Sequence, residues 1–366
     1  MRLSIVLLPG DGIGPEVTEE AVRVLDAAAH AGGHTIHRST HPIGGTALRS
    51  HGSALPESTL RACFDADAVF LGAVGDPAFD RSAPAQRPEA GLLALRLALG
   101  GYANLRPAFC PDGLIGRSAY RPDLVRGADL LVVRELLGGL YFGEPRAVDL
   151  EAGTAHNTMR YERWEIDRVA RVAFDQARMR RKLVTSVDKA NVLETSRLWR
   201  ATVSAVAADY PDVTLEHALV DSCATRLALA PRSFDVILTE NLFGDILSDQ
   251  AAALAGSLGL LPSATLGGRV PLFEPVHGSA PDIAGRGAAN PIGAIASMAM
   301  LLRSAAHLPH EADNIEHAIR EVLSAGHRTR DIAGPGDAVV TTRQMGDLVI
   351  AALAEVAERR HSYHGV

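Results

Sequence analysis

The sequence contains few cysteines, few aromatic residues and no long apolar run. Its 366 residues include only three cysteines, and they are Cys63, Cys110 and Cys223. They are scattered and lack C-x-x-C spacing, so neither a disulfide framework nor a zinc knuckle is expected, and a reducing cytoplasm fits. The apolar start at residues 1–8 runs directly into Pro9. It is too short for a signal sequence or a membrane span and predicts a buried first strand.

An excess of positive charge is also missing. The formal net charge is −7, and no basic run occurs. This balance argues against a surface that follows nucleic-acid phosphates, so small-molecule partners are expected. With 47% hydrophobic residues, a chain of this length can bury a large core, and it is long enough for two domains.

Short β-rich runs alternate with longer segments of helical periodicity, which predicts an α/β protein. No internal repeat or low-complexity tract is found. The predicted strands are residues 3–8, 68–71, 130–133, 183–187, 213–220 and 236–239. The predicted helices are residues 16–29, 89–99, 161–180, 191–208, 242–254, 291–306, 314–325 and 344–358.

Glycines mark two hinge candidates, at residues 100–101 and 256–261. They predict a first domain of residues 1–99 plus 252–366, with a second domain of residues 100–251 inserted into it. Residues 138–157 contain several glycines and a weak helical pattern. They predict an irregular or β-ribbon arm that reaches a partner subunit.

Asp245 and Asp249 lie one helical turn apart in an otherwise apolar segment. Two carboxylates buried side by side repel each other unless a proton or a metal ion relieves them. Oxygen ligands favour Mg²⁺ or Mn²⁺ over zinc. The pair therefore predicts a divalent cation site.

Three arginines extend this pattern toward a carboxylate ligand. Arg106 and Arg134 each border an apolar run, and arginine binds carboxylates in bidentate fashion. The helix at residues 89–99 places four side chains on one face, and these are Glu89, Leu92, Leu93 and Arg96. Any one arginine alone is more often a surface ion pair. Together, beside the aspartates, they predict a site for a small polycarboxylate with an apolar substituent.

Lys189, Tyr141 and Asp221 are further candidates, each with a structural alternative. Lys189 follows a predicted strand and is either a base with a lowered pKa or a solvated lysine at a helix start. Tyr141 lies among glycines and is a proton donor or a packing residue. Asp221 ends a predicted strand and is a third metal carboxylate or a cap.

Glycine loops at residues 10–15 and 278–285 can hold a cofactor phosphate through backbone N–H groups, and simple turns are the alternative for each. The first loop reads Gly-x-Gly-x-Gly and lacks the third spacing of the dinucleotide fingerprint. A Rossmann site is therefore not predicted.

Taken together, the motifs resemble the isocitrate/isopropylmalate family of β-decarboxylating dehydrogenases along nearly the whole chain. The segments that carry the resemblance are residues 10–16, 91–96, 102–107, 138–145, 186–194, 243–249 and 274–285. The resemblance implies a two-domain α/β fold with a twisted mixed sheet, distinct from a Rossmann fold. It also implies a homodimer whose active sites are shared between subunits.

The activity implied is NAD-dependent oxidative decarboxylation of (2R,3S)-3-isopropylmalate to 4-methyl-2-oxopentanoate in leucine biosynthesis. By the family pattern, Arg96, Arg106 and Arg134 bind the malate carboxylates. Lys189 removes the proton of the C2 hydroxyl, and Tyr141 assists protonation at C3. The metal ligands implied for Mg²⁺ or Mn²⁺ are Asp245 and Asp249, with Asp221 supplied by the partner subunit.

Asp282 and Ile283 match the NAD-using pattern, because a carboxylate suits a free ribose hydroxyl and repels a 2′-phosphate. The cofactor residues implied are Gly75, Asn191, Glu274, His277, Gly278, Ser279, Ala280, Asp282, Ile283 and Asn290. The substrate pocket implied adds Glu89, Leu92, Leu93 and Val192, whose apolar members favour an alkyl group.

An apolar pocket discriminates by only ~1–3 kcal/mol per methylene, so homoisocitrate, tartrate and benzylmalate stay open as substrates. A non-catalytic dicarboxylate-binding paralogue is an alternative of a different class. Two departures from the family pattern are Asp76, where glycine is usual, and Asp221-Ser-Cys-Ala-Thr225.

Overall fold

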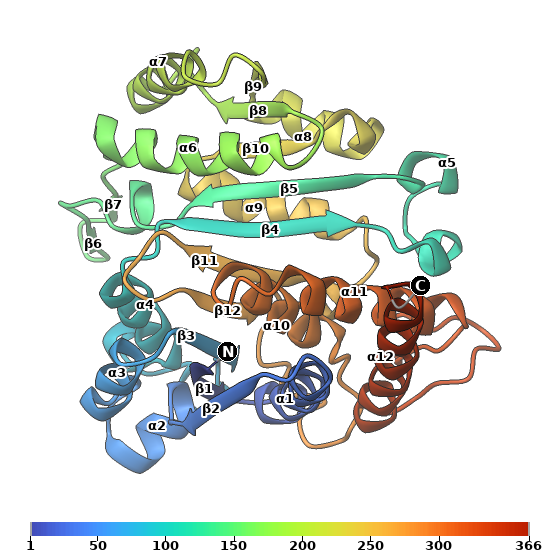
Figure 1. Ribbon diagram of the computed structural model, residues 1–366. Coiled ribbons are helices and arrows are strands. Elements are labelled where there is room, and N and C mark those ends of the chain that lie inside the picture. Colours follow the sequence, from blue (N-terminus) through green and yellow to red (C-terminus); the bar gives the residue numbers. More distant parts are fainter. Residues whose placement is uncertain (1, 365–366) are drawn as a thin grey trace. The chain divides into compact units, whose positions relative to one another are not determined.

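The computed structural model of the protein describes the backbone of residues 2–364 and the side chains of residues 2–359. The chain divides into two compact units, which Figure 1 shows coloured along the sequence. Unit 1 comprises Met1–Gly101, Pro111–Ser118 and Ala255–Val366. Unit 2 comprises Tyr102–Cys110 and Ala119–Leu254.

Unit 1 contains five strands in the order β2-β1-β3-β12-β11. These are β1 (Arg2–Gly10), β2 (Thr35–Thr40), β3 (Ala68–Ala73), β11 (Pro262–Leu266) and β12 (Leu272–Pro275). Strand β1 pairs in parallel with β2 and β3, and β12 pairs in parallel with β3. Strands β11 and β12 are antiparallel, so the sheet is mixed.

Helices cover both faces of this part of the sheet. The helices α1 (Gly14–Ala31), α10 (Ile292–Ser304), α11 (Pro309–Ser324) and α12 (Thr342–His364) pack against one another. The other group is α2 (Gly44–His51), α3 (Glu57–Phe64) and α4 (Pro88–Leu99).

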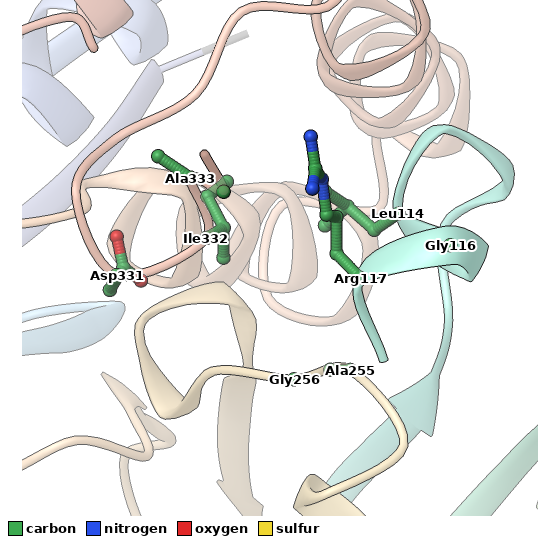
Figure 2. A pocket seen from close by; sticks show the side chains of 9 residues that line it. Leu114, Gly116, Arg117, Ala255, Gly256, Asp331, Ile332 and Ala333 are labelled. Carbon is green, nitrogen blue, oxygen red and sulfur yellow. The ribbon is translucent and has the colours of Figure 1, made fainter. Parts of the chain in front are cut away.

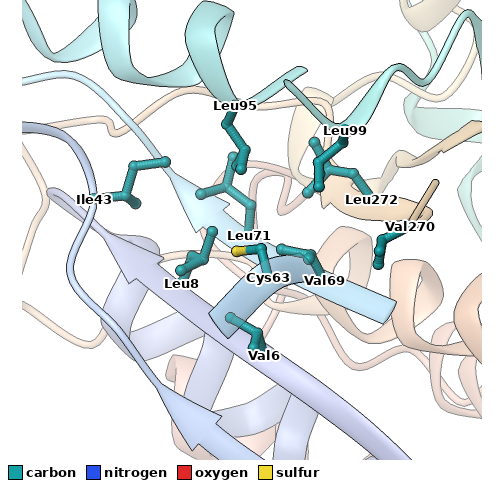
Figure 3. Packing of buried hydrophobic residues seen from close by; sticks show 10 residues of the cluster. All are labelled: Val6, Leu8, Ile43, Cys63, Val69, Leu71, Leu95, Leu99, Val270 and Leu272. Atoms are coloured by element: carbon teal, nitrogen blue, oxygen red, sulfur yellow. The ribbon is translucent and has the colours of Figure 1, made fainter. Parts of the chain in front are cut away.

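Side chains alternate between the faces of a strand, so residues two apart in β1 and in β3 point the same way. One such face packs against α3 and α4 in the core cluster of Figure 3. The cluster consists of Val6, Leu8, Ile43, Cys63, Val69, Leu71, Leu95, Leu99, Val270 and Leu272. Every residue of β3 is buried, as expected for a strand covered on both faces.

Unit 2 contains five strands in the order β4-β5-β10-β8-β9. They are β4 (Ala103–Phe109), β5 (Asp129–Glu135), β8 (Leu183–Asp188), β9 (Thr214–Leu219) and β10 (Val236–Thr239). Strands β4 and β5 are antiparallel, and the other pairs within the unit are parallel. Helices α6 (Arg163–Arg178) and α7 (Glu194–Ala207) cover one face. Helices α8 (Val220–Leu229) and α9 (Asn241–Ala252) cover the other, and α5 (Pro122–Val125) is a single turn.

A separate two-stranded ribbon occupies the middle of the glycine-rich excursion. Strands β6 (Ala147–Asp149) and β7 (Thr154–His156) pair antiparallel, and all six of their residues are exposed. Val148 and the turn residue Leu150 are 67% and 88% exposed. The excursion is therefore a β-ribbon that leaves apolar side chains uncovered.

The prediction of an α/β protein with a mixed sheet is confirmed, and each predicted strand and helix overlaps an observed one. Several boundaries differ by a few residues from the predictions, and one of these differences bears on a candidate site residue, because Val220 begins α8 instead of ending β9. Asp221 therefore lies in the first turn of a helix, where a carboxylate is favoured by the helix dipole. Within residues 2–364, no helix is both long and apolar enough to cross a membrane.

Candidate active site

Helix α9 carries the aspartate pair that the sequence singled out. Its first turn is capped by Glu240, whose carboxylate accepts hydrogen bonds from the backbone of Leu242 (3.0 Å) and Phe243 (2.7 Å). Asp245 and Asp249 follow one turn apart on one face. Neither carboxylate is fully buried, because the side chains of Asp245 and Asp249 are 35% and 62% exposed. They lie at an accessible edge of the helix, where a ligand can reach them.

Arg134, from the end of β5, lies directly against this helix. Its side chain is 3% exposed, and its Nη1 donates to Asp245 Oδ1 at 2.5 Å. Gly244 makes this approach possible, since a Cβ at that position would lie 2.6 Å from Arg134 Cγ. Asn241 Oδ1 accepts two further hydrogen bonds from the guanidinium, from Nε at 3.1 Å and from Nη2 at 2.8 Å.

Arg106 brings a second guanidinium to the same carboxylates. It projects from β4, and its Nη1 lies 3.7 Å from Asp245 Oδ1 and 3.5 Å from Asp249 Oδ1. Ser248 Oγ accepts a hydrogen bond from Nη1 at 2.9 Å, and Asn104 Oδ1 accepts one from Nε at 2.7 Å. Two arginines predicted to bind carboxylates therefore meet the two predicted metal ligands in one cluster of unit 2.

Tyr141 completes this cluster. It ends the short 3-10 helix η4 (Gly139–Tyr141), and its hydroxyl donates to Asp245 Oδ2 at 2.5 Å. The Arg134 guanidinium lies 5.3 Å from the centre of its ring. Burial raises the pKa of Tyr141 above its ordinary value, and the hydrogen bond to Asp245 adds to the rise. The phenol thus keeps its proton at neutral pH and can serve as a donor.

Lys189 and Asp221 form a separate pair within the chain. Lys189 follows β8, and its Nζ lies 2.5 Å from Asp221 Oδ1. The hydrogen bond from Lys189 lowers the pKa of Asp221. Behind the lysine, the carboxylate of Asp188 binds Arg200 at 2.8 and 2.9 Å and the backbone N–H of Ala190 at 2.9 Å. These contacts fix the turn that presents Lys189.

The three predicted metal aspartates do not form one site within a single chain. Among residues 2–364, no group of three or more histidine, cysteine, aspartate or glutamate side chains is arranged to hold a metal ion. The oxygen donors of Asp245 and Asp249 suit Mg²⁺ or Mn²⁺ in type, and their exposure leaves room for an ion and a further ligand. Asp245 and Asp249 therefore have the donor atoms and the accessibility that a Mg²⁺ or Mn²⁺ ligand needs.

The third arginine, Arg96, belongs to unit 1. It projects from α4 and donates from Nη2 to Glu274 Oε1 of β12 at 2.7 Å. On the same helix, Leu92 packs partly against the core cluster, and Leu93 is 41% exposed. Glu89 is exposed in the first turn. Helix α4 thus presents a cation, an acid and an apolar patch along one face, as the periodicity predicts.

A carboxylate with no predicted role joins the glycine loop of residues 10–15 to the start of α2 and to the turn at Gly75. Asp11 is 3% exposed. Its oxygens accept backbone N–H groups of Gly45 (2.8 Å), Thr46 (2.8 Å) and Gly75 (3.0 Å). The hydroxyl of Thr46 adds a fourth hydrogen bond at 3.1 Å. Because its partners are far along the chain, only the position of Asp11 in a glycine-rich motif could have drawn attention to it.

The predicted cofactor loops approach each other closely around Ser279. Ile13 donates from its backbone to Ser279 O at 2.8 Å. Gly75 has φ +139°, and a Cβ there would lie 2.9 Å from Ser279 Oγ. Only glycine suits both the backbone conformation and the contact. Next to it, Asp76 pairs with Arg49 and accepts a hydrogen bond from Ala78 N at 3.0 Å. Arg49 is thus the partner of the residue that departs from the family pattern.

The loop after β12 fits a polar ligand such as a dinucleotide. Burial lowers the pKa of His277, and its Nε2 is buried without a hydrogen-bond partner in the described part of the chain. Such an orphaned buried nitrogen is costly unless a ligand or water binds it. Asp282 is exposed and accessible to a ribose hydroxyl. Asn290 donates to Asp331 Oδ2 at 3.0 Å.

Asp331 also lines a cavity of ≈ 300 Å³ in unit 1, shown in Figure 2. The remaining lining residues are Leu114, Gly116, Arg117, Ala255, Gly256, Ile332, Ala333 and Gly334. Arg117 is itself engaged, donating to Asp337 at 2.7 Å. The cavity therefore borders the predicted cofactor region through the bond between Asp331 and Asn290.

Comparison with known proteins identifies relatives along nearly the whole chain. The model of the family "Isocitrate/isopropylmalate dehydrogenase" matches residues 4–349. A protein named 3-isopropylmalate dehydrogenase from Geobacillus kaustophilus is 54% identical over 354 residues, which is 96% of this chain and 95% of that protein. A protein of the same name from Nitratidesulfovibrio vulgaris is 54% identical over 353 residues, or 95% of this chain and 99% of that one.

Solved structures agree in fold. The isocitrate dehydrogenase from Methylococcus capsulatus superimposes with a TM-score of 0.84 at 38% identity, covering 96% of this chain and 99% of that one. The β-decarboxylating dehydrogenase from Thermococcus kodakarensis gives a TM-score of 0.80 at 38% identity, covering 96% of each chain.

Proposed function

Because the chain belongs to the isocitrate/isopropylmalate dehydrogenase family, we propose that it oxidatively decarboxylates (2R,3S)-3-isopropylmalate to 4-methyl-2-oxopentanoate in leucine biosynthesis. The observation that carries the proposal is 54% identity over 96% of the chain to a relative named for that substrate. The cluster of two arginines, two aspartates and a tyrosine in unit 2 suits the chemistry.

In this proposal, Arg96, Arg106 and Arg134 bind the two malate carboxylates. Substrate carboxylates would replace the carboxylates that these arginines now contact, Glu274 for Arg96 and Asp245 for Arg134. Bidentate guanidinium binding orients the C2–C3 bond for reaction. Glu89, Leu92, Leu93 and Val192 would surround the 3-substituent.

Proton transfer would involve two side chains. Lys189 would take the proton of the C2 hydroxyl after leaving Asp221 for the substrate, and Tyr141 would deliver a proton to C3 after CO₂ is lost. When bound, NAD⁺ supplies the hydride acceptor, and Mg²⁺ or Mn²⁺ supplies positive charge at the C2 oxygen.

We further propose a homodimer with shared sites. Asp245 and Asp249 of one subunit would bind the metal ion with Asp221 of the partner subunit, beside the partner's Lys189 and the partner's Asn191. The incomplete metal site in one chain supports this arrangement. The exposed ribbon β6–β7, with Val148 and Leu150 uncovered, supports an arm that packs against the other subunit.

NAD is the proposed cofactor. Its site would be built mainly in unit 1, where glycines allow close backbone approach and His277 Nε2 lacks a partner among the described residues. The proposed residues are Gly75, Asn191, Glu274, His277, Gly278, Ser279, Ala280, Asp282, Ile283 and Asn290. A cytoplasmic location is proposed with it, since all three cysteines are buried and none of them forms a disulfide.

The test is a panel of 3-substituted malates assayed with NAD⁺ and with NADP⁺, in Mg²⁺, Mn²⁺ and EDTA. We expect NADH and CO₂ to form together from 3-isopropylmalate, only with metal and preferentially with NAD⁺. Faster turnover of homoisocitrate, tartrate or benzylmalate would reassign the substrate within the family. Metal-dependent binding without turnover of any of them would favour a non-catalytic paralogue.

A further inference from the structure

Asn241 connects groups of unit 2 that the proposed chemistry needs in fixed positions. It is the first residue of α9 and is 0% exposed. Its amide nitrogen donates to the backbone oxygens of Leu136 at 3.1 Å and Gly138 at 3.0 Å. Its amide oxygen accepts from Arg134 Nε and Nη2. Both amide protons and both lone pairs are therefore used, and every partner lies more than 100 residues away along the chain.

The turn that Asn241 holds leads directly to Tyr141. Gly138 and Gly139 pack against the ring of Tyr161, because a Cβ on either would lie within 2.7 Å of a Tyr161 atom. The hydroxyl of Tyr161 in turn accepts the backbone N–H of Asn241 at 3.0 Å. The start of α9 is thus linked to the turn before Tyr141 in two ways. The Asn241 side-chain amide binds the turn directly, and the Tyr161 side chain contacts both.

We infer that Asn241 is a positioning residue that sets the mutual distances of Arg134, Tyr141 and Asp245. Arg134 and Tyr141 both bind Asp245, at 2.5 Å each, but through different oxygens. That arrangement requires the β5 arginine and the η4 tyrosine to approach α9 from fixed directions. Asn241 links all three elements and touches none of the reacting atoms. The inference rests on the proposed function only for the effect on turnover.

The side chain must be an amide of this length. Aspartate would still accept from Arg134, but it has no protons for the carbonyls of Leu136 and Gly138, which would lose their partners in a buried place. Serine is too short to reach both sides. The Asn241→Asp variant therefore releases the tyrosine turn while keeping the arginine contact, and Asn241→Ser weakens both.

The matched control is Asp235→Asn, the reverse exchange at another buried site of unit 2. Asp235 is 1% exposed and accepts from Arg180 Nε (2.9 Å) and from the backbone of Arg181 (2.8 Å). It contacts none of the proposed site residues. This control reports the effect of exchanging a buried amide and carboxylate on general stability.

The experiment compares kcat, KM values and backbone hydrogen exchange by mass spectrometry for the dimeric enzyme. We expect Asn241→Asp to lower kcat about 100-fold, the loss expected for misplacement by roughly 1 Å. KM for NAD⁺ should change less than twofold, and Asp235→Asn should keep kcat within about twofold. Exchange should accelerate at residues 134–141 and 241–245 and stay unchanged at residues 183–188.

Unchanged kcat in both Asn241 variants would overturn the inference. Acceleration of exchange throughout unit 2, with kcat falling only as far as in the Asp235 control, would also overturn it, since Asn241 would then act on stability alone. If the wild-type enzyme turns over no 3-substituted malate, the proposed function fails. Hydrogen exchange still tests the inference in that case, because local acceleration needs no substrate. If Asn241→Asp does not fold, Asn241→Ser is measured in its place.

Discussion

Replacing Glu135 with glutamine is predicted to change how the stability of unit 2 depends on pH. Glu135 ends β5 and is 0% exposed. Its carboxylate accepts the backbone N–H groups of Leu137 (2.9 Å) and Gly138 (2.8 Å) and the hydroxyl of Tyr161 (3.2 Å). Loss of hydration outweighs these hydrogen bonds and raises the pKa of Glu135 from 4.5 to about 7.

One cation lies near Glu135. The Arg168 guanidinium is 3.8 Å from the carboxylate and lies over the rings of Tyr102 and Trp164, 4.3 and 4.5 Å from their centres. A second carboxyl, Glu240, also contacts the Tyr161 hydroxyl, at 3.4 Å. Burial raises the pKa of Glu240 as well. A single phenol proton cannot satisfy both carboxylates, so retention of a proton by Glu135 relieves their repulsion.

The sign and size of the effect follow from these values. The folded protein holds the Glu135 proton more tightly than the unfolded chain does, so the stabilisation is complete below pH 4.5 and is lost as pH rises through about 7. At ~1.4 kcal/mol per pH unit, the loss is about 3 kcal/mol. Glutamine cannot titrate, so the variant lacks this slope. Glutamine also places an amide donor against a backbone N–H, which costs about 1–3 kcal/mol at every pH.

The assay is urea unfolding at about pH 5 and about pH 8, followed by tryptophan fluorescence. Trp199 reports on the right region, because it is 2% exposed and its ring lies 5.6 Å from that of Tyr161. The measured quantity is the change in unfolding free energy between the two pH values, wild type against Glu135→Gln. The control is Glu57→Gln, because the Glu57 side chain is 86% exposed. Its unfolding free energy should change between the two pH values by the same amount as that of the wild type.

Parallel stability curves for the wild type and Glu135→Gln would refute the reasoning, since Glu135 would then titrate as it does in the unfolded chain. A wild type that becomes more stable between the two pH values, relative to the variant, would show that hydrogen bonding to the ionised form outweighs burial. Either result would also remove the argument for a retained proton between the two buried carboxyls.

Three further predictions concern other parts of the two units. Gly244→Ala should raise KM for the malate at least about tenfold and lower the melting temperature, since its Cβ would meet Arg134 at 2.6 Å; unchanged KM would contradict that packing. Lys189→Met should abolish turnover while calorimetry still detects metal-dependent malate binding, and retained turnover would exclude it as the base. Asp76→Gly should raise KM for NAD⁺ more than KM for the malate. It should alter stability by less than about 1 kcal/mol, because its partner Arg49 is 57% exposed; equal changes in both KM values would contradict a role at the cofactor.

Local sequence patterns predicted where helices and strands lie better than they predicted which side chains are buried. The i, i+4 spacing placed Asp245 and Asp249 correctly on one helix face. Their exposure was not predictable, because it depends on what covers the outer side of α9, where Ile246 is also 58% exposed. Helix α2 was missed, since it begins with two glycines, which are poor helix formers, and its eight residues are too few to display more than about two helical turns. Strand β4 was missed because Arg106 and Pro107 interrupt its apolar pattern.

The contacts that the sequence did not predict join residues that are far apart along the chain. The bond between Lys189 and Asp221 joins residues 32 apart, and the bonds of Asn241 join elements more than 100 residues apart. No periodicity contains this information, because the distances are set by the order of strands in the sheet. Residue type and motif could identify Lys189 as a candidate base and Asp221 as a candidate metal ligand, each separately. The ion pair between Lys189 and Asp221, and the contacts of Asn241, arise only when the chain is folded.

The single carboxylate of Asp11 has a kinetic consequence for unit 1. It holds the start of α2 and the Gly75 turn at once, and the loop that carries Asp11 is joined to Ser279 through Ile13. Segments that share one anchor cannot loosen one at a time without leaving a buried charge short of donors. Opening of this region should therefore occur as one concerted event with one rate. Release of the proposed NAD cofactor would then show a single relaxation phase.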